Sequence, residues 1–256
     1  MCLTRRNDSE NDFMDGVHRQ NVRRQINCGN CPMASHCLPS SLSLSEIDIL
    51  DEMVKRSRPL ERGEFLFRQG EAFRSIFALR TGTVKNYCIT DGGVEQITGF
   101  QLPSEILGLA GMGEGTYPVS AQTLESSSVC EIPFERLDEL TEVIPQLRRQ
   151  LMRTMSREIR EDQQMMLLLS KKTSEERIAT FLINLSARFR ARGYSAHTLR
   201  LSMSRGEIGN YLGVAMETVS RTFAKLQQQG LIRVNGREVE MVDSIRLCQL
   251  AGGGYR

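Results

Sequence analysis

The spacing of hydrophobic residues changes along the chain, and each spacing predicts a different kind of structure. In residues 44–55 apolar side chains recur every three or four positions, which is the period of an amphipathic helix. From 58 to 133 short stretches alternate apolar and polar residues, and glycine-containing turns separate them. Short strands with frequent turns are typical of an antiparallel barrel or double-sheet roll.

Residues 145–172 read as one long helix, with Pro145 near its start. One seam of this helix is spaced by alternating fours and threes and consists of Arg148, Met152, Met155, Ile159, Asp162, Met166 and Leu169. A long heptad seam favours a partner helix, so we predict a dimerisation helix. The alternative is that the seam packs against its own barrel.

Asp162 is the acidic member of this seam. In a dimer it would face its twin, and two carboxylates held close together repel or force one of them to take up a proton. The spacing leaves two interpretations: a solvated position at the edge of the seam, or a residue that weakens dimerisation.

The last third of the chain carries the pattern of a winged helix-turn-helix. A helix is expected over 173–192, with Ser174 as its cap and Gly193 as its end. The Ser-x-x-Glu form of a capping box opens a short helix at residue 204, and Gly213 supplies a tight turn before a second helix over 215–229. A hairpin over 231–242, turning at Asn235-Gly236, would be the wing, with Arg233 and Arg237 placed to contact phosphates.

The second of these helices has a buried and an open face. Val219, Phe223 and Leu226 recur at core spacing, which leaves Glu217, Ser220 and Arg221 on the other side of its first turns. Arg221 suits guanine O6 and N7, and Glu217 suits the amino group of cytosine. We therefore predict that these three residues read double-stranded DNA from the major groove.

Charge supports that prediction only through its distribution. The formal net charge is +2, but residues 173–256 hold twelve Lys and Arg against seven Asp and Glu. Residues 1–172 hold 21 Lys and Arg against 24 Asp and Glu. A basic C-terminal third on a slightly acidic body fits phosphate contacts.

Several function classes are disfavoured by what the sequence lacks. No apolar run approaches the roughly 18–20 residues of a membrane span, and the first 24 residues are polar, so a cytoplasmic protein without a signal peptide is expected. The three histidines and the absence of known catalytic motifs argue against an enzyme.

Seven cysteines stand in the chain, and three of them fall within ten residues, at Cys28, Cys31 and Cys37. An odd count without a secretion signal disfavours a disulfide framework, and clustered thiolates suit one metal centre. The fourth donor is open between Cys130, Cys88, His36 and Cys2. Zinc and an iron–sulfur cluster both remain possible, as does a metal-free switch in which Cys28 and Cys31 form a disulfide.

The order of roll, long helix and winged helix-turn-helix, with the signature Glu217-Thr-Val-Ser220-Arg221, resembles the CRP/FNR superfamily of transcription regulators. Within it the chain is most similar to the FNR branch (ANR-type), the oxygen-sensing anaerobic regulators. The resemblance extends over residues 28–251, and the stretches that carry it are 95–100, 129–134, 167–172 and 209–213.

The resemblance implies more than the residues alone do. It implies that Cys28, Cys31, Cys37 and Cys130 hold one oxygen-labile [4Fe-4S] cluster per subunit, while Cys2, Cys88 and Cys248 do not. It implies that Asp162 keeps the cluster-free protein monomeric, and that the cluster-loaded homodimer reads two-fold TTGAT-like sites. RNA polymerase is an expected partner of such regulators.

Cyclic AMP is the effector of the other branch, whose pocket pairs an arginine with a serine around the phosphate. No arginine precedes Ser120 here, so we expect no cyclic nucleotide to bind. The predicted α+β chain thus divides into a mobile tail (1–25), an iron–sulfur sensor with an antiparallel β-roll (26–144), a dimerisation helix (145–172) and a winged helix-turn-helix (173–256).

Overall fold

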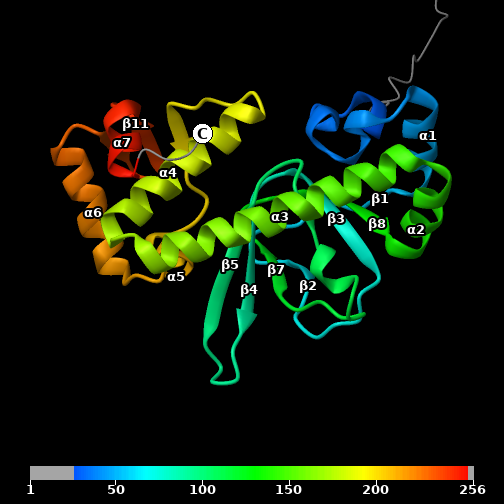
Figure 1. The fold of residues 1–256 in the computed structure, drawn as a ribbon, viewed down its shortest axis with the longest axis horizontal. Coiled ribbons are helices and arrows are strands. Elements are labelled where there is room, and N and C mark those ends of the chain that lie inside the picture. The colour runs from blue at the N-terminus through cyan, green and yellow to red at the C-terminus, as the bar shows by residue number, and fades with distance from the viewer. Residues whose placement is uncertain (1–25, 253–256) are drawn as a thin grey trace, which may run out of the picture.

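The computed structural model describes residues 26–252. The tail expected at 1–25 lies outside the described residues. An antiparallel β-roll domain and a C-terminal winged-helix domain are joined by one long helix that crosses the whole molecule (Figure 1). The predicted α+β class, with this order of parts, is confirmed.

The roll consists of two four-stranded antiparallel sheets. One has the order β1 (Lys55–Arg56), β8 (Ser128–Pro133), β3 (Ser75–Thr81) and β6 (Ile106–Leu107). The other has the order β2 (Phe65–Phe67), β7 (Ser120–Thr123), β4 (Val84–Ile89) and β5 (Glu95–Gln101). A buried cluster fills the roll, and its members include Phe67, Leu79, Val84, Leu107, Tyr117 and Ala121.

Short helices surround the first sheet. They are η1 (Cys28–Asn30), η2 (Ala34–His36), η3 (Leu38–Ser41), α1 (Leu44–Met53), η4 (Leu109–Gly111) and α2 (Phe134–Val143). The helix expected over 44–55 ends two residues early, because Lys55 and Arg56 leave it to pair with β8 as strand β1.

The long helix α3 (Pro145–Lys171) covers 27 residues and uses two faces differently. Leu147, Leu151, Thr154 and Leu168 are buried against the same chain. Large apolar side chains on the other face remain exposed, among them Met152, Ile159, Met166 and Leu167. The helix therefore anchors itself to its own subunit and still presents an open apolar stripe.

The C-terminal domain contains α4 (Ser174–Ala191), β9 (Thr198–Arg200), α5 (Arg205–Leu212), α6 (Met216–Gln228), β10 (Ile232–Asn235), β11 (Glu238–Met241) and α7 (Ser244–Leu250). Its sheet has the order β10-β11-β9. Neither β9 nor α7 was expected from the sequence, because β9 has only three residues and its pairing partner lies some 40 positions away.

Two local predictions in this domain were wrong. Thr173, not Ser174, caps α4: its hydroxyl accepts from the amide of Glu176, whose carboxylate accepts from the amide of Thr173. In the wing, Asn235 pairs with Glu238, so Gly236 and Arg237 form the turn. Gly236 has a φ of 58°, which suits the first position of a tight hairpin turn.

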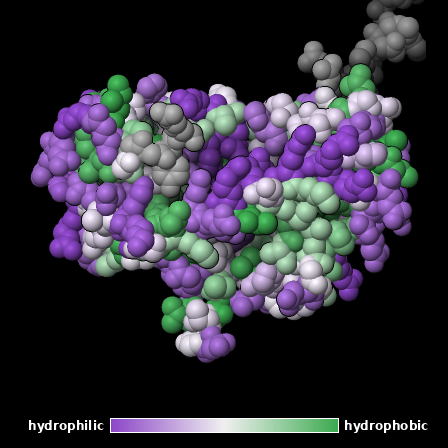
Figure 2. Space-filling model, viewed as in Figure 1, coloured by the Kyte–Doolittle hydropathy of each residue, from purple (hydrophilic) through white to green (hydrophobic). Residues whose placement is uncertain are grey.

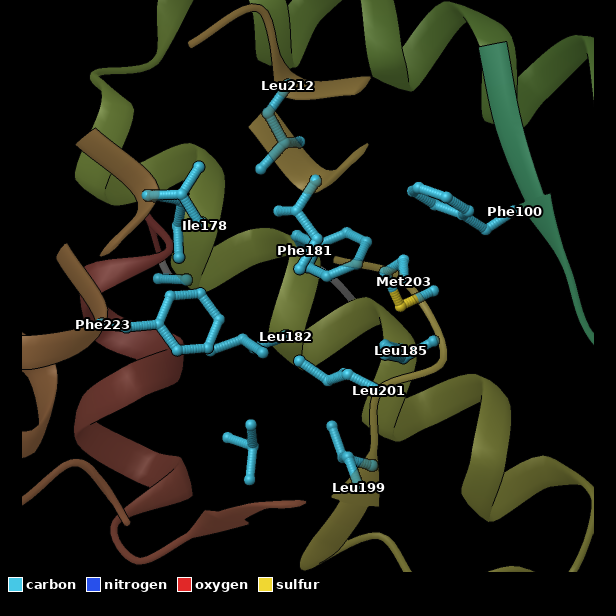
Figure 3. Packing of buried hydrophobic residues seen from close by; sticks show 14 of the residues in the cluster. Phe100, Ile178, Phe181, Leu182, Leu185, Leu199, Leu201, Met203, Leu212 and Phe223 are labelled. Carbon is cyan, nitrogen blue, oxygen red and sulfur yellow. The ribbon is translucent and has the colours of Figure 1, made fainter. Parts of the chain in front are cut away.

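The two domains share a continuous core. Phe100 of β5 lies 6.2 Å from the ring of Phe181 in α4 and 5.1 Å from that of Tyr211 in α5, measured between ring centroids. Figure 3 shows Phe100 reaching from the roll toward Phe181 and Met203 of the C-terminal domain. This packing holds the first helix of the helix-turn-helix against the β-roll.

The surface crossed by α3 mixes hydrophilic side chains with small hydrophobic patches, and the projecting β4–β5 hairpin carries hydrophobic groups at its tip (Figure 2). Ile89 and Val94 of that hairpin are among the exposed apolar residues. Within residues 26–252, no helix is long and apolar enough to cross a membrane.

Candidate functional site

The structure brings the four singled-out cysteines to one cavity. Cys28, Cys31 and Cys37 come from the segment of η1 to η3, and Cys130 comes from the middle of β8. All four line the cavity, together with apolar side chains that include Leu38, Leu50, Val54 and Ile132. Residues some ninety positions apart in sequence therefore share one largely apolar enclosure.

Local hydrogen bonds fix the first cysteine. The side chains of Asn27 and Asn30 each accept from the other's backbone amide at 2.9 Å, which forms a reciprocal cap on η1. The amide of Cys28 donates to the Asp51 carboxylate of α1 at 2.6 Å. The start of the cysteine segment is thereby tied to α1.

Strand register fixes the last cysteine. Cys130 lies opposite Arg56 of β1 on one side and opposite Ala78 of β3 on the other. Directly opposite residues in an antiparallel sheet share a face. The central position of β8 therefore presents the thiol of Cys130 beside the Arg56 side chain.

Burial controls the protonation of these thiols. It is the main cause that raises the pKa of Cys28, of Cys130 and of Cys37, the last to about 12. These groups stay protonated at neutral pH in the metal-free protein, and binding a metal must displace their protons.

The donor set fits a thiolate-held centre. Thiolates are the soft ligands that zinc and iron–sulfur clusters accept, and an apolar shell limits the access of water. Among the described residues, no three His, Cys, Asp or Glu side chains are already arranged closely enough to hold a single metal ion.

The other candidate donors lie elsewhere. His36 is not among the described residues that line the cavity. Cys88 belongs to β4 in the opposite sheet, where its thiol donates weakly to the Gln96 carbonyl at 3.8 Å. Cys248 lies on α7, and Cys2 falls outside the described residues. Of the three choices for a fourth donor that the structure describes, Cys130, Cys88 and His36, only Cys130 lines the cavity with Cys28, Cys31 and Cys37.

The helix-turn-helix is built by a cap and two glycines. At the start of α5 the amide of Ser204 donates to the Glu207 carboxylate at 2.8 Å, and the amide of Glu207 donates to the Ser204 hydroxyl at 3.1 Å. Gly213 ends α5 in the left-handed conformation, with a φ of 63°. At Gly209 an added Cβ would stand 2.6 Å from the Val214 carbonyl, so the two helices approach closely only because this residue lacks a side chain.

The second helix, α6, divides its residues as expected. Val219, Phe223 and Leu226 are buried, while Glu217, Ser220 and Arg221 are exposed on its outer side. Nη2 of Arg221 donates a weak hydrogen bond to the Thr218 hydroxyl at 3.4 Å. Figure 1 shows α6 at the outer edge of the molecule, at the far end from the cysteine cavity.

Both wing arginines are exposed at the strands beside this helix. Arg233 pairs with Glu240 at 2.5 Å across β10 and β11, and Arg237 donates to the Ser202 carbonyl at 3.4 Å. Their contacts are at the surface, so the guanidinium groups remain open to an anionic partner.

The predicted seam of α3 is mostly exposed. The exposed fractions of Met152, Ile159 and Met166 are 58%, 59% and 69%, and Arg148 and Asp162 are exposed as well. Met155 is the partly buried member, and it packs against the core next to the roll. The seam does not serve as the helix's own-subunit face, which Leu147, Leu151 and Leu168 supply.

Acidic groups gather on the part of α3 near the roll. Burial first, and then the neighbouring Asp162 and Glu161, raise the pKa of Glu158 to about 7. Partial burial also raises the pKa of Asp162. Asp162 thus belongs to a cluster of like charges, which the seam pattern alone did not reveal.

Two linking residues were missed by the sequence analysis. Arg177 of α4 donates to the carbonyls of Leu169, Lys172 and Leu212 at 2.8, 3.0 and 2.9 Å, which joins the ends of α3 and α5. Asn210 of α5 holds the edge of β5: its Oδ1 accepts from the Ile97 amide at 2.6 Å, and its Nδ2 donates to the Glu95 carbonyl at 2.8 Å. An asparagine inside a helix was the available signal, since this residue is unfavourable there without a partner.

A β-roll, a long helix with an open apolar stripe and a helix-turn-helix whose second helix is exposed together define a winged-helix transcription regulator. Family models agree: residues 57–143 match the cyclic nucleotide-binding domain, and residues 176–250 match the Crp-like helix-turn-helix domain.

Curated relatives place the chain more narrowly. It is 69% identical over 229 residues to the transcriptional activator protein Anr of Pseudomonas aeruginosa, covering 90% of this chain and 94% of that one. It is 48% identical over 227 residues to the fumarate and nitrate reduction regulatory protein of Escherichia coli, covering 89% and 91%. The chain belongs to the CRP/FNR family and is an FNR-like, DNA-binding transcription regulator.

A solved relative has the same architecture. FixK2 from Bradyrhizobium japonicum superposes with a TM-score of 0.71 at 30% identity, covering 77% of this chain and 96% of that one. The fold therefore agrees with the class of protein that the curated relatives define, a DNA-binding transcription regulator.

Proposed function

We propose that the protein is an oxygen-responsive regulator that holds one [4Fe-4S] cluster per subunit on Cys28, Cys31, Cys37 and Cys130. The observation that carries this proposal is that these four thiols, and no other described cysteine, line one apolar cavity. When bound, the cluster supplies an oxygen-labile link among the four thiolates. The relatives named Anr and fumarate and nitrate reduction regulatory protein support the same assignment.

The chain provides a direct route from this cavity to the dimer helix. Helix η3 begins at Leu38, immediately after Cys37, and it packs against α3. Holding Cys37 and Cys130 at one centre fixes η3 between the roll and α3. In oxygen the thiols are released, η3 loses that restraint, and the α3 helices of two subunits separate.

We propose that the dimer forms along Arg148, Met152, Met155, Ile159, Asp162 and Met166. This stripe is exposed in a single subunit, and its apolar members gain free energy when a second helix covers them. Asp162 opposes that gain, so the dimer is stable only when the cavity is loaded. The carboxylate of Asp162 thereby sets a threshold for association.

The dimer would place two α6 helices about one DNA turn apart, roughly 34 Å, on a two-fold operator. Glu217, Ser220 and Arg221 would read each TTGAT-like half-site, and Arg233 and Arg237 would hold phosphates. RNA polymerase is the further partner proposed from the family. No cyclic nucleotide is proposed as effector, because Pro118 and Val119 stand where a cation would precede Ser120.

Two alternatives from other classes remain distinguishable. A zinc-stapled regulator would use the same thiols without sensing gas. A metal-free disulfide switch at Cys28 and Cys31 is less favoured, because burial raises the pKa of Cys28 and the thiolate is the reactive form.

The deciding experiment is a visible absorption spectrum, with iron and sulfide assays, on protein purified without oxygen and then exposed to air. A brown chromophore that bleaches in air, with about four irons per chain, is the expected result. A colourless protein that contains zinc would show that the four thiols hold a structural zinc ion in place of a cluster. A colourless, metal-free protein whose DNA binding returns with a thiol reductant would indicate the disulfide switch.

A further inference from the structure

A guanidinium group stands beside the thiols at the cysteine cavity. Arg56 lines that cavity, and its Nη2 donates toward the Cys28 sulfur at 3.6 Å. The β1–β8 register also places Arg56 opposite Cys130. One side chain therefore lies next to the first and the last of the four cysteines, which come from distant parts of the chain.

Asp51 holds this guanidinium in place. Arg56 forms a close ion pair with the Asp51 carboxylate, and that carboxylate also accepts the Cys28 amide at 2.6 Å. The side chains of Arg56 and Asp51 are only 23% and 24% exposed. The ion pair is thus half-buried, and the Arg56 guanidinium has little freedom to move into solvent.

Four thiolates gather a large negative charge in an apolar cavity, where charge is costly unless it is compensated. A hydrogen bond from a cation to a sulfur offsets part of that cost and orients the ligand. Among the described residues that line the cavity, Arg56 and Arg80 are the basic ones. Of these two, Arg56 donates a hydrogen bond to a cysteine sulfur, and Arg80 donates none to the described cysteines.

We propose that Arg56 is a positioning residue for the metal centre: it donates to the Cys28 thiolate, faces Cys130 and compensates the charge of the loaded site. Asp51 sets the direction of its guanidinium. This inference rests on the proposed function, because it needs a thiolate-held centre in the cavity. It adds that the loaded site is held by charge and hydrogen bonding as well as by its four ligands.

The experiment compares iron retention and reduction potential in anaerobically loaded full-length protein. Arg56→Gln removes the charge at similar size, and the chelator concentration that strips half of the iron should fall about 10- to 100-fold. Its reduction potential should fall too, since loss of a nearby positive charge disfavours the more reduced, more negative state. Arg56→Lys keeps the charge and should restore most of both values.

Two matched controls separate this role from general effects. Arg58 lies two residues away, is paired with Glu64 at 2.6 Å and does not line the cavity, so Arg58→Gln should leave both values unchanged. Arg80→Gln removes a charge at the cavity without a sulfur bond and should have an intermediate effect. Thermal unfolding of each metal-free variant reports whether the fold is intact.

Several outcomes would overturn the inference. Wild-type iron retention and potential in Arg56→Gln would do so, as would a lowered melting temperature with an unchanged potential, which indicates a purely structural role. If the wild-type chain holds zinc, the proposed function fails while zinc release in the same chelator series still decides the role of Arg56. A wild-type chain that holds neither metal overturns both proposals.

Discussion

The cysteine cavity and the recognition helix lie toward opposite ends of α3, and they are built in opposite ways (Figure 1). The cavity collects thiols from two distant segments into an apolar enclosure. On α6 the three proposed base-reading residues fall within the five consecutive positions 217–221. They stay exposed because the apolar residues on the other face of the helix are buried. The first site therefore depends on the tertiary fold, whereas the second depends on one helix and its turn.

This difference has a consequence for how each site fails. Under the proposed function, removing one thiol should destroy the shared centre, because no other described cysteine lines the cavity to take its place. Removing one reading group costs only its own contacts with the base. The predictions below test that contrast, from the largest expected effect to the smallest.

Replacing Cys130 with Ala should abolish cluster binding. The remaining three thiols come from one segment, and the sheet contributes no other cysteine to the cavity. Iron and sulfide assays after anaerobic loading measure the effect. Cys88→Ala is the matched control, since that residue lies in the other sheet and should leave the iron content unchanged. A normal cluster in the Cys130 variant would contradict the assignment.

Replacing Arg221 with Gln should weaken binding at one base pair by about 1–3 kcal/mol and relax discrimination there. The residue is exposed on α6 and has only a weak bond to Thr218. Binding to operators with every base at each half-site position, at fixed salt, gives the measurement. Arg233→Gln in the wing serves as the phosphate control. Equal losses of affinity on all operators would mean that Arg221, like Arg233, contacts only phosphate.

Replacing Asp162 with Ala should produce dimers in air. Removing a pair of facing carboxylates relieves about 1–2 kcal/mol of repulsion, between the water and near-surface values for charges a few ångströms apart. That corresponds to roughly a tenfold tighter dimer. Analytical ultracentrifugation of the cluster-free protein measures it, with Asp138→Ala on α2 as the control. A variant that stays monomeric at all concentrations would exclude this role for the seam.

The smallest expected effect concerns how the free energy of unfolding changes with pH. Burial and the neighbouring acids raise the pKa of Glu158 to about 7, above its ordinary value. Folding therefore favours its protonated form, so this contribution to stability is present at low pH and is lost as pH rises through about 7. After allowance for partial exposure the effect should be about 1–2 kcal/mol.

Thermal unfolding of the cluster-free monomer from pH 4.5, the ordinary pKa of a glutamate, up to about pH 8 measures this contribution, and most of the change should fall below pH 7. The midpoint should fall as the pH rises, and Glu158→Gln should flatten the slope. Glu142→Gln on exposed α2 is the control. An unchanged slope in the Glu158 variant would assign the pH dependence to other groups.

Most of the recognition helix could be predicted from the sequence, because its information is local. The capping box at Ser204, the turn at Gly213 and the period of Val219, Phe223 and Leu226 each act within one or two turns of helix. The misplaced wing turn and cap show the limit of this reasoning. There, Thr173 and Gly236 compete with adjacent residues of similar propensity. The capping box with Glu176 selects Thr173, and the pairing of Asn235 with Glu238 places the turn at Gly236.

The cysteine cavity could be predicted only in part. The spacing of Cys28, Cys31 and Cys37 indicates a shared centre, but the place of Cys130 depends on how β8 pairs with β1 and β3. The same register sets Arg56 beside it. Asn210 and Arg177 were missed for a related reason, since their partners are backbone groups of elements far away in sequence.

The length of α3 turns a small rotation at one end of the helix into a larger displacement at the other end. Its 27 residues span about 40 Å at 1.5 Å per residue. A rotation of only about 5° at the end near η3 moves the opposite end by about 3.5 Å, which is close to the 3.4 Å rise of one base pair. Because Arg177 fastens α5 to that far end and Asn210 fastens the same helix to β5, a rotation of α3 against the roll must shift the contacts between α5 and β5 as well, so the position of the helix-turn-helix depends on both attachments.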